Sequence, residues 1–107
     1  MHTVIVTFRL QGITHEEFTG FTTGVAPAFA DVPGLVAKVW LADAHTGAYG
    51  GVHLFEDADA AVAYLRSDLF DQAVTTNPLF TEVAVRRAAV VDAATAITTP
   101  GLAVPVG

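Results

Sequence analysis

The sequence predicts an α+β domain built on a four-stranded antiparallel sheet. Two observations lead to this fold class. Segments with strand and helix periodicity follow one another in the order strand, helix, strand, strand, helix, strand. The 107 residues, of which 52% are hydrophobic, are also enough for one domain with a single core, and no repeat or low-complexity linker divides them.

The first strand and the first helix are predicted by a change of period. Apolar and polar residues alternate over residues 3–10, which is typical of a strand. Residues 14–17 read Thr-His-Glu-Glu, the form of a capping box, so a helix is expected to begin there. Its apolar stripe has helical spacing and consists of Phe18, Phe21, Val25, Ala28 and Phe29. Pro27 lacks a backbone donor, and we expect it to kink or break the helix near Ala26.

The second half of the chain predicts three more strands and a helix. Strands are expected at residues 35–42 and 49–55, joined around Thr46 and Gly47. Asp57 is placed to cap a second helix whose apolar stripe runs to about Leu69. A short helical or irregular connection over residues 67–77 then leads to a fourth strand, from 79 to about 91.

This element order is that of a split βαβ pair, the ferredoxin-like βαββαβ arrangement, in which both helices cover one face of the sheet. We expect residues 1–91 to form this domain. Residues 92–107 are expected to form a C-terminal tail that is available to contact a partner subunit.

The two central strands each have one mixed face and one small apolar face. Lys38 and Trp40 share a face of the strand at 35–42, while Tyr49, His53 and Phe55 share a face of the strand at 49–55. A two-residue turn would pair Trp40 with His53 and Lys38 with Phe55, so that the mixed faces coincide. We expect the small apolar face beneath the helices and the mixed face on the open side.

An open, largely aromatic sheet face of this size is more than a monomer usually exposes. A second copy related by a two-fold axis is the expected cover, so the sequence predicts a homodimer. Two such sheets meeting face to face would leave a cavity in each half, lined by Trp40, Tyr49, His53 and Phe55.

Composition argues against several classes of protein. A formal net charge of -6 disfavours nucleic acid as a partner. The chain has no cysteine, and its N-terminal apolar run is too short to span a membrane, so we expect a cytoplasmic protein with no membrane partner. Its four histidines lie at no metal-ligand spacing, and no glycine-rich loop links a strand to a helix. We therefore expect no metal and no cofactor.

Several short motifs carry a family resemblance. Pro33-Gly34-Leu35, Lys38-x-Trp40, the run Gly-Gly-Val-His-Leu-Phe over residues 50–55, and Ala61-x-x-Tyr64 resemble the dimeric α+β barrel superfamily, in particular the small YdhR-like and antibiotic-biosynthesis-type monooxygenases. The resemblance covers about residues 3–91. It implies a homodimer of ferredoxin-like protomers. Members of that superfamily include cofactor-independent oxygenases, isomerases, cyclases and haem-degrading enzymes, so the site must decide among them.

His53 and Lys38 are the candidate catalytic residues. The near-neutral pKa of histidine suits a general base that removes a phenolic or activated C–H proton. Lys38 could stabilise the resulting anion in an apolar cavity. Each also has a structural interpretation: His53 as a hydrogen-bonded residue of the sheet or dimer contact, and Lys38 as a side chain that extends to the rim.

The candidate substrate-binding residues are Trp40, Tyr49, Phe55, Tyr64 and Arg86. Trp40 would hold an aromatic ring, and the tyrosine hydroxyls could line the pocket mouth. Arg86 and Arg87 point to opposite faces of their strand, so at most one enters a cavity.

The predicted function is that of a cofactor-independent monooxygenase acting on a planar phenolic, anthrone or quinone-like substrate. A base would form a carbanion, which reacts with dioxygen. Two alternatives use the same pocket: an isomerase, cyclase or dehydratase that consumes no oxygen, and a non-catalytic binder of small aromatic molecules.

Overall fold

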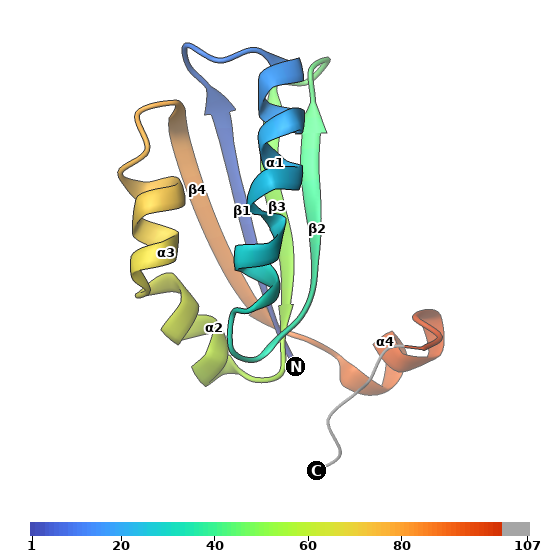
Figure 1. Ribbon diagram of the computed structural model, residues 1–107. Coiled ribbons are helices and arrows are strands. Elements are labelled where there is room, and N and C mark those ends of the chain that lie inside the picture. Colours follow the sequence, from blue (N-terminus) through green and yellow to red (C-terminus); the bar gives the residue numbers. More distant parts are fainter. Residues whose placement is uncertain (102–107) are drawn as a thin grey trace.

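The computed structural model describes residues 1–101 (Figure 1). Its elements are β1 (His2–Leu10), α1 (His15–Ala30), β2 (Leu35–Asp43), β3 (Ala48–Phe55), α2 (Ala58–Leu65), α3 (Asp68–Phe70), η1 (Asp71–Thr75), β4 (Phe80–Ala89) and α4 (Asp92–Thr98). The strands form one sheet in the order β2-β3-β1-β4, with every neighbouring pair antiparallel. The predicted ferredoxin-like α+β fold is confirmed.

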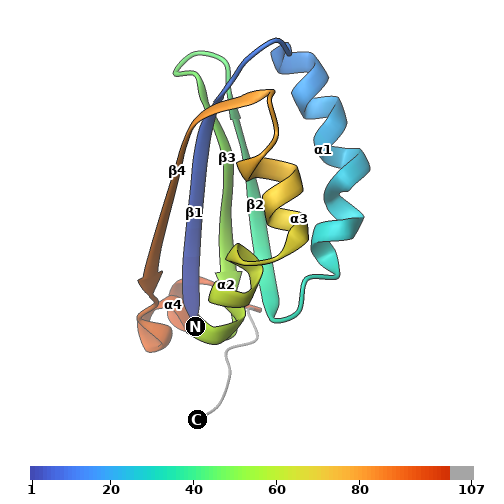
Figure 2. The ribbon, with the colours of Figure 1, turned by 90° about the vertical axis from the view of Figure 1, so that its left-hand side faces the viewer.

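The molecule has two layers. Helices α1, α2 and α3 all cover the same face of the sheet, and the opposite face carries no helix within residues 1–101 (Figures 1 and 2). The C-terminal helix α4 lies beyond the end of the sheet, close to the N-terminus, where the Met1 ammonium pairs with Asp92 at 2.8 Å. No helix within residues 1–101 combines the length and the apolarity needed to cross a membrane.

Helix α1 begins as the sequence predicts. Thr14 Oγ1 accepts the Glu17 backbone N–H at 3.1 Å, and Glu17 Oε1 accepts the Thr14 N–H at 3.0 Å. The predicted break near Ala26 is wrong, because the helix runs through Pro27 to Ala30. A proline inside a helix costs about 3 kcal/mol, and burial of a phenylalanine such as Phe29 contributes a comparable amount of about 2–3 kcal/mol.

Helix α2 begins at its predicted cap but ends early. Asp57 Oδ1 accepts the Ala60 N–H at 2.8 Å. The helix ends at Leu65 rather than near Leu69, because Ser67 caps a new turn: its hydroxyl accepts the Phe70 N–H at 3.2 Å. The connection expected over residues 67–77 is therefore helical, formed by α3 and the π-helical turn η1.

The pairing of β2 with β3 differs from the predicted register by two residues. Lys38 pairs with His53, and Trp40 pairs with Gly51, so the predicted pairs Trp40–His53 and Lys38–Phe55 are wrong. The loop is longer than two residues because the Asp43 carboxylate accepts the backbone N–H groups of residues 45 and 46. A shift of the strand register by two residues preserves the alternation of side chains between the faces, so the two mixed faces still coincide as predicted.

The predicted orientation of the sheet is wrong. The mixed face lies under the helices: the rings of Trp40 and Phe29 are 5.2 Å apart, and His53 is 2% exposed. The small apolar residues instead lie on the open face, where Val39 is 59% exposed. Large side chains are needed to fill the space between sheet and helices, and Val4, which pairs with His53, is fully buried there.

Gly50 allows β3 to pass close to β1, which yields a first prediction. Its φ is 140°, and an added Cβ would overlap the carbonyl oxygen of Val6, so Gly50→Ala is expected to lower the free energy of unfolding by about 2 kcal/mol or more. Urea unfolding followed by circular dichroism measures the change. Gly24→Ala in α1 is the control, since an added Cβ there meets no atom within 4 Å and should be neutral or stabilise by up to about 1 kcal/mol. Equal effects of the two substitutions would contradict this assignment.

Candidate active site

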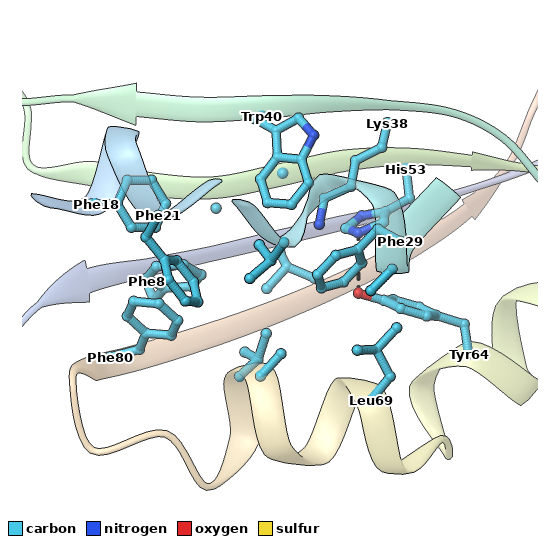
Figure 3. A pocket seen from close by; sticks show the side chains of 17 residues that line it. Phe8, Phe18, Phe21, Phe29, Lys38, Trp40, His53, Tyr64, Leu69 and Phe80 are labelled. Atoms are coloured by element: carbon cyan, nitrogen blue, oxygen red, sulfur yellow. Dashed lines mark hydrogen bonds between the residues drawn. The ribbon is translucent and has the colours of Figure 1, made fainter. Parts of the chain in front are cut away.

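A cavity of about 120 Å³ lies between the covered face of the sheet and the helices (Figure 3). Most of its wall is aromatic or aliphatic, and none of the lining residues within the described chain is acidic. They are Val6, Phe8, Phe18, Phe21, Val25, Ala28, Phe29, Lys38, Trp40, Gly50, Gly51, His53, Tyr64, Leu69, Ala73, Val74 and Phe80. Phe21 is 45% exposed and therefore stands on the solvent side of the cavity.

Lys38 reaches into this cavity from β2. Its Nζ lies 3.5 Å from the centroid of the Phe29 ring and 3.6 Å from that of Trp40, so the ammonium stands over two aromatic rings. Gly51 makes room for the lysine stem, because a Cβ there would lie 3.0 Å from Lys38 Cε and 3.4 Å from His53 Cε1. The lysine side chain therefore packs directly against the backbone of β3 at Gly51.

Burial lowers the pKa of Lys38 from 10.5 to about 7, since a charged amine is disfavoured in apolar surroundings. The two ring faces act in the opposite direction, because they stabilise the ammonium. No carboxylate among residues 1–101 pairs with this amine. Lys38 can therefore exist in both its charged and its neutral form near neutral pH.

His53 is held by hydrogen bonds at both ring nitrogens. Nδ1 lies 3.1 Å from the Val4 carbonyl oxygen, which can only accept, so Nδ1 carries the proton and donates it. Nε2 must then be the acceptor for the Tyr64 hydroxyl at 3.2 Å. One imidazole in this way links β3 to β1 and to α2 (Figure 3).

Burial keeps His53 neutral. Burial lowers the pKa of His53 to about 4, the charge of Lys38 acts in the same direction, and the Val4 hydrogen bond opposes both. Burial also raises the pKa of Tyr64. Because the Nε2 lone pair already accepts a hydrogen bond from the Tyr64 hydroxyl, His53 is poorly placed to remove a proton from a substrate. Lys38 is the better acceptor at neutral pH.

The structure brings together four of the seven predicted site residues: Lys38, Trp40, His53 and Tyr64 line one cavity. The other three, Phe55, Tyr49 and Arg86, do not line it. Phe55 stacks behind His53 with a centroid distance of 6.1 Å, and Tyr49 hydrogen-bonds His15 at 3.0 Å. Arg86 is exposed on the open face, where it pairs with Ile5 of β1.

Sequence reasoning missed the aromatic wall that α1 contributes. Phe21 and Phe29 belong to the apolar stripe that predicts this helix, and both line the cavity although neither is among the predicted site residues. Phe8 and Phe80 complete the far wall as a stacked pair 4.0 Å apart. A phenylalanine-rich helix facing a strand with a lysine was the available signal.

The fold and this cavity define a ferredoxin-like α+β protein with one ionisable amine inside an aromatic pocket. The chain belongs to the family described as "Putative mono-oxygenase ydhR", whose model matches residues 4–100. No curated protein gives a significant match. The family supports a monooxygenase-like function.

Solved structures share the fold. MhuD, a heme-degrader from Mycobacterium tuberculosis with two hemes in its active site, has a TM-score of 0.67 at 18% identity, over 85% of this chain and 96% of that one. SnoaB, a cofactor-independent oxygenase from Streptomyces nogalater solved as a mutant, has a TM-score of 0.64 at 22% identity, over 84% and 92%. A "putative antibiotic biosynthesis monooxygenase" from Deinococcus radiodurans has a TM-score of 0.68 at 14% identity, over 84% and 92%.

The cavity does not suit heme. A heme iron is held by a protein ligand such as an imidazole, and both ring nitrogens of His53 are already hydrogen-bonded. His53 is also the one histidine among the lining residues that the structure describes. Within the same residues, no group of three or more histidine, aspartate or glutamate side chains is arranged to hold a metal ion.

The lowered pKa of Lys38 predicts a pH-dependent stability. Between pH 7 and 10.5 the unfolded chain binds more protons than the folded one, so stability should rise with pH over this window. Below pH 7 the folded protein contains a buried charged amine, which lowers its stability. Lys38→Met removes this unfavourable charge. We expect the variant to be more stable by about 1–3 kcal/mol at pH 6, after a reduction for solvent screening, and to lose this advantage near pH 10.

Urea unfolding at the two pH values measures this difference. Arg66→Met is the matched control, because Arg66 is an exposed basic residue at the end of α2. Its effect should be the same at both pH values. An advantage of Lys38→Met that does not change with pH would show that the amine is charged throughout.

Proposed function

We propose that this protein is a cofactor-independent monooxygenase-like enzyme that acts on a small planar aromatic substrate. One observation carries the proposal: the Lys38 amine stands over two aromatic rings inside a cavity with aromatic walls, where burial lowers its pKa to about 7. The family assignment supports oxygen chemistry. The neighbour SnoaB, described as a cofactor-independent oxygenase, is consistent with it.

The size of the cavity bears on the substrate. At about 120 Å³ it is comparable to dry protein cavities of roughly 150 Å³ that bind benzene. One phenolic or quinone-like ring fits this space. A three-ring anthrone would require Phe21, the exposed part of the wall, to move aside.

The proposed reaction begins with neutral Lys38 taking a proton from the phenol or from an activated C–H group. The resulting ammonium then stands beside the substrate anion and stabilises it. The anion supplies electrons to dioxygen and forms a peroxide at carbon. Loss of water leaves a new carbonyl, so that one oxygen atom enters the product and the other leaves as water. The substrate provides all the electrons.

His53 and Tyr64 have a positioning role in this scheme. The imidazole fixes the tyrosine hydroxyl at 3.2 Å, and that oxygen keeps lone pairs that can accept a hydrogen bond from a substrate hydroxyl. The proton goes to Lys38 rather than to His53, because the Nε2 lone pair is occupied. This assignment replaces the general base that the sequence favours.

Oxygen uptake tests the proposal. With an electron-rich phenol that carries hydrogen para to its hydroxyl, the protein is expected to consume one dioxygen per turnover and yield the para-quinone and water, with a rate that rises as pH passes about 7. Lys38→Met should lower kcat/KM by about 10²- to 10⁴-fold, the usual contribution of a proton acceptor. Arg66→Met, at an exposed residue that does not line the cavity, should leave the rate unchanged.

An oxygen electrode and product mass spectrometry give the readouts. Conversion of the substrate without oxygen uptake would overturn oxygenation in favour of an isomerase, cyclase or dehydratase. Saturable binding with no conversion would identify a binder of aromatic molecules. A Lys38→Met variant with the parental rate would contradict the role given to the amine.

We also propose that two copies associate through the open face of the sheet. A central row of this face runs across all four strands as Val39, Val52, Ile5 and Arg86, with exposed apolar side chains at Val39 and Ile5. Helix α4 projects past the end of the sheet with Ile97 80% exposed, so it is placed to contact a second copy. A two-fold axis would cover both surfaces at once.

Sedimentation or light scattering tests the association. The protein is expected to have twice the mass of one chain, and Val39→Glu should shift it to the monomer, because a buried charge without a partner opposes the contact. Thr23→Glu on the exposed side of α1 is the control and should remain dimeric. A monomeric parent protein at micromolar concentration would refute the dimer.

A further inference from the structure

Lys38 is the only lysine in the chain; the other four basic residues are arginines. A lone lysine is commonly found on the surface, where its charge is hydrated. Here it stands instead over the rings of Phe29 and Trp40, inside a cavity whose walls are aromatic and aliphatic. Arginine cannot lose its proton in a protein, whereas lysine can, so the residue type at this position matters chemically.

The surroundings of Lys38 favour a neutral, nucleophilic amine. The titratable groups near it are His53, its cross-strand partner on β3, and Tyr64 on α2, and neither carries a negative charge at neutral pH. No acid contributes to the described cavity wall. Amines in such apolar surroundings are those that form imines with carbonyl compounds.

The cavity also leaves room for a covalently bound ring. About 120 Å³ of space lies within this wall, roughly enough for one aromatic ring, and Phe21, which is 45% exposed, forms its solvent side. Figure 3 shows the amine directed into the hollow between Trp40, Phe29 and His53. The Tyr64 hydroxyl donates its proton to His53 and lines the same cavity, so its oxygen keeps a lone pair that can accept a hydrogen bond from the hydroxyl of a carbinolamine.

We propose that this pocket captures small aromatic aldehydes as an imine on Lys38. The amine lone pair attacks the carbonyl carbon, and the C=O π pair moves to oxygen. Proton transfer from nitrogen to that oxygen gives a carbinolamine, which loses water to form the C=N bond. The step needs no oxidant or reductant. It uses the cavity of the proposed oxygenase but does not depend on oxygenation.

Reductive trapping tests the proposal on the full chain. Benzaldehyde with sodium cyanoborohydride is expected to add one benzyl group, and peptide mass mapping should place it on Lys38. The only other amine, the Met1 N-terminus, is paired with Asp92 and should remain largely unmodified. The labelling rate should rise as pH passes about 7, whereas an ordinary surface lysine would require a far more alkaline pH.

Two further arms test the geometry. Lys38→Arg keeps the charge but removes the nucleophile and should abolish the adduct at residue 38, with circular dichroism to check that the variant is folded. A three-ring aldehyde such as anthracene-9-carbaldehyde should react at least tenfold more slowly than benzaldehyde, because the cavity is sized for one ring.

Modification of Met1 alone, or labelling of Lys38 only after unfolding in urea, would overturn the proposal. Failure here is distinguishable from failure of the oxygenase, since trapping is measured by mass under nitrogen and oxygen uptake is measured without an aldehyde. Adduct formation with no oxygen uptake would leave Lys38 as a carbonyl-binding residue.

Discussion

The burial of one amine among aromatic rings is the constraint on which the site depends. Taking a charged amine out of water costs several kcal/mol unless it finds a partner. Lys38 finds no carboxylate within the described residues, and two ring faces recover only part of that cost. The remaining penalty appears as a lowered pKa. The same unfavourable burial that weakens the fold therefore makes the amine chemically available.

The hydrogen bonds of His53 hold the floor of the cavity in place. A single imidazole connects the carbonyl of Val4 in β1 to the hydroxyl of Tyr64 in α2. Because both ring nitrogens are satisfied, a polar group can stand in the core without an unpaired atom. The histidine thus secures the geometry around Lys38, and in the proposed mechanism the lysine rather than the histidine carries the acid–base chemistry.

The two faces of the sheet serve different purposes. The covered face carries the large aromatic residues and the ionisable groups, which fill most of the space beneath α1 and α2 and line a small cavity. The open face carries small aliphatic residues such as Val39 and Val52, which suit a flat contact better than a pocket. In the proposed dimer, the open faces provide the contact between copies and each protomer keeps its own site.

The sequence by itself determined the order of the elements, the caps at Thr14 and Asp57, and the alternation that puts Lys38, Trp40 and His53 on one face. These features depend on neighbours a few residues away, so local patterns report them. Tertiary structure decided which face the helices cover, the two-residue change of register, and the contact of Lys38 with Phe29. Each of these depends on packing between distant segments, where volume and hydrogen-bond satisfaction across the whole core outweigh local preference.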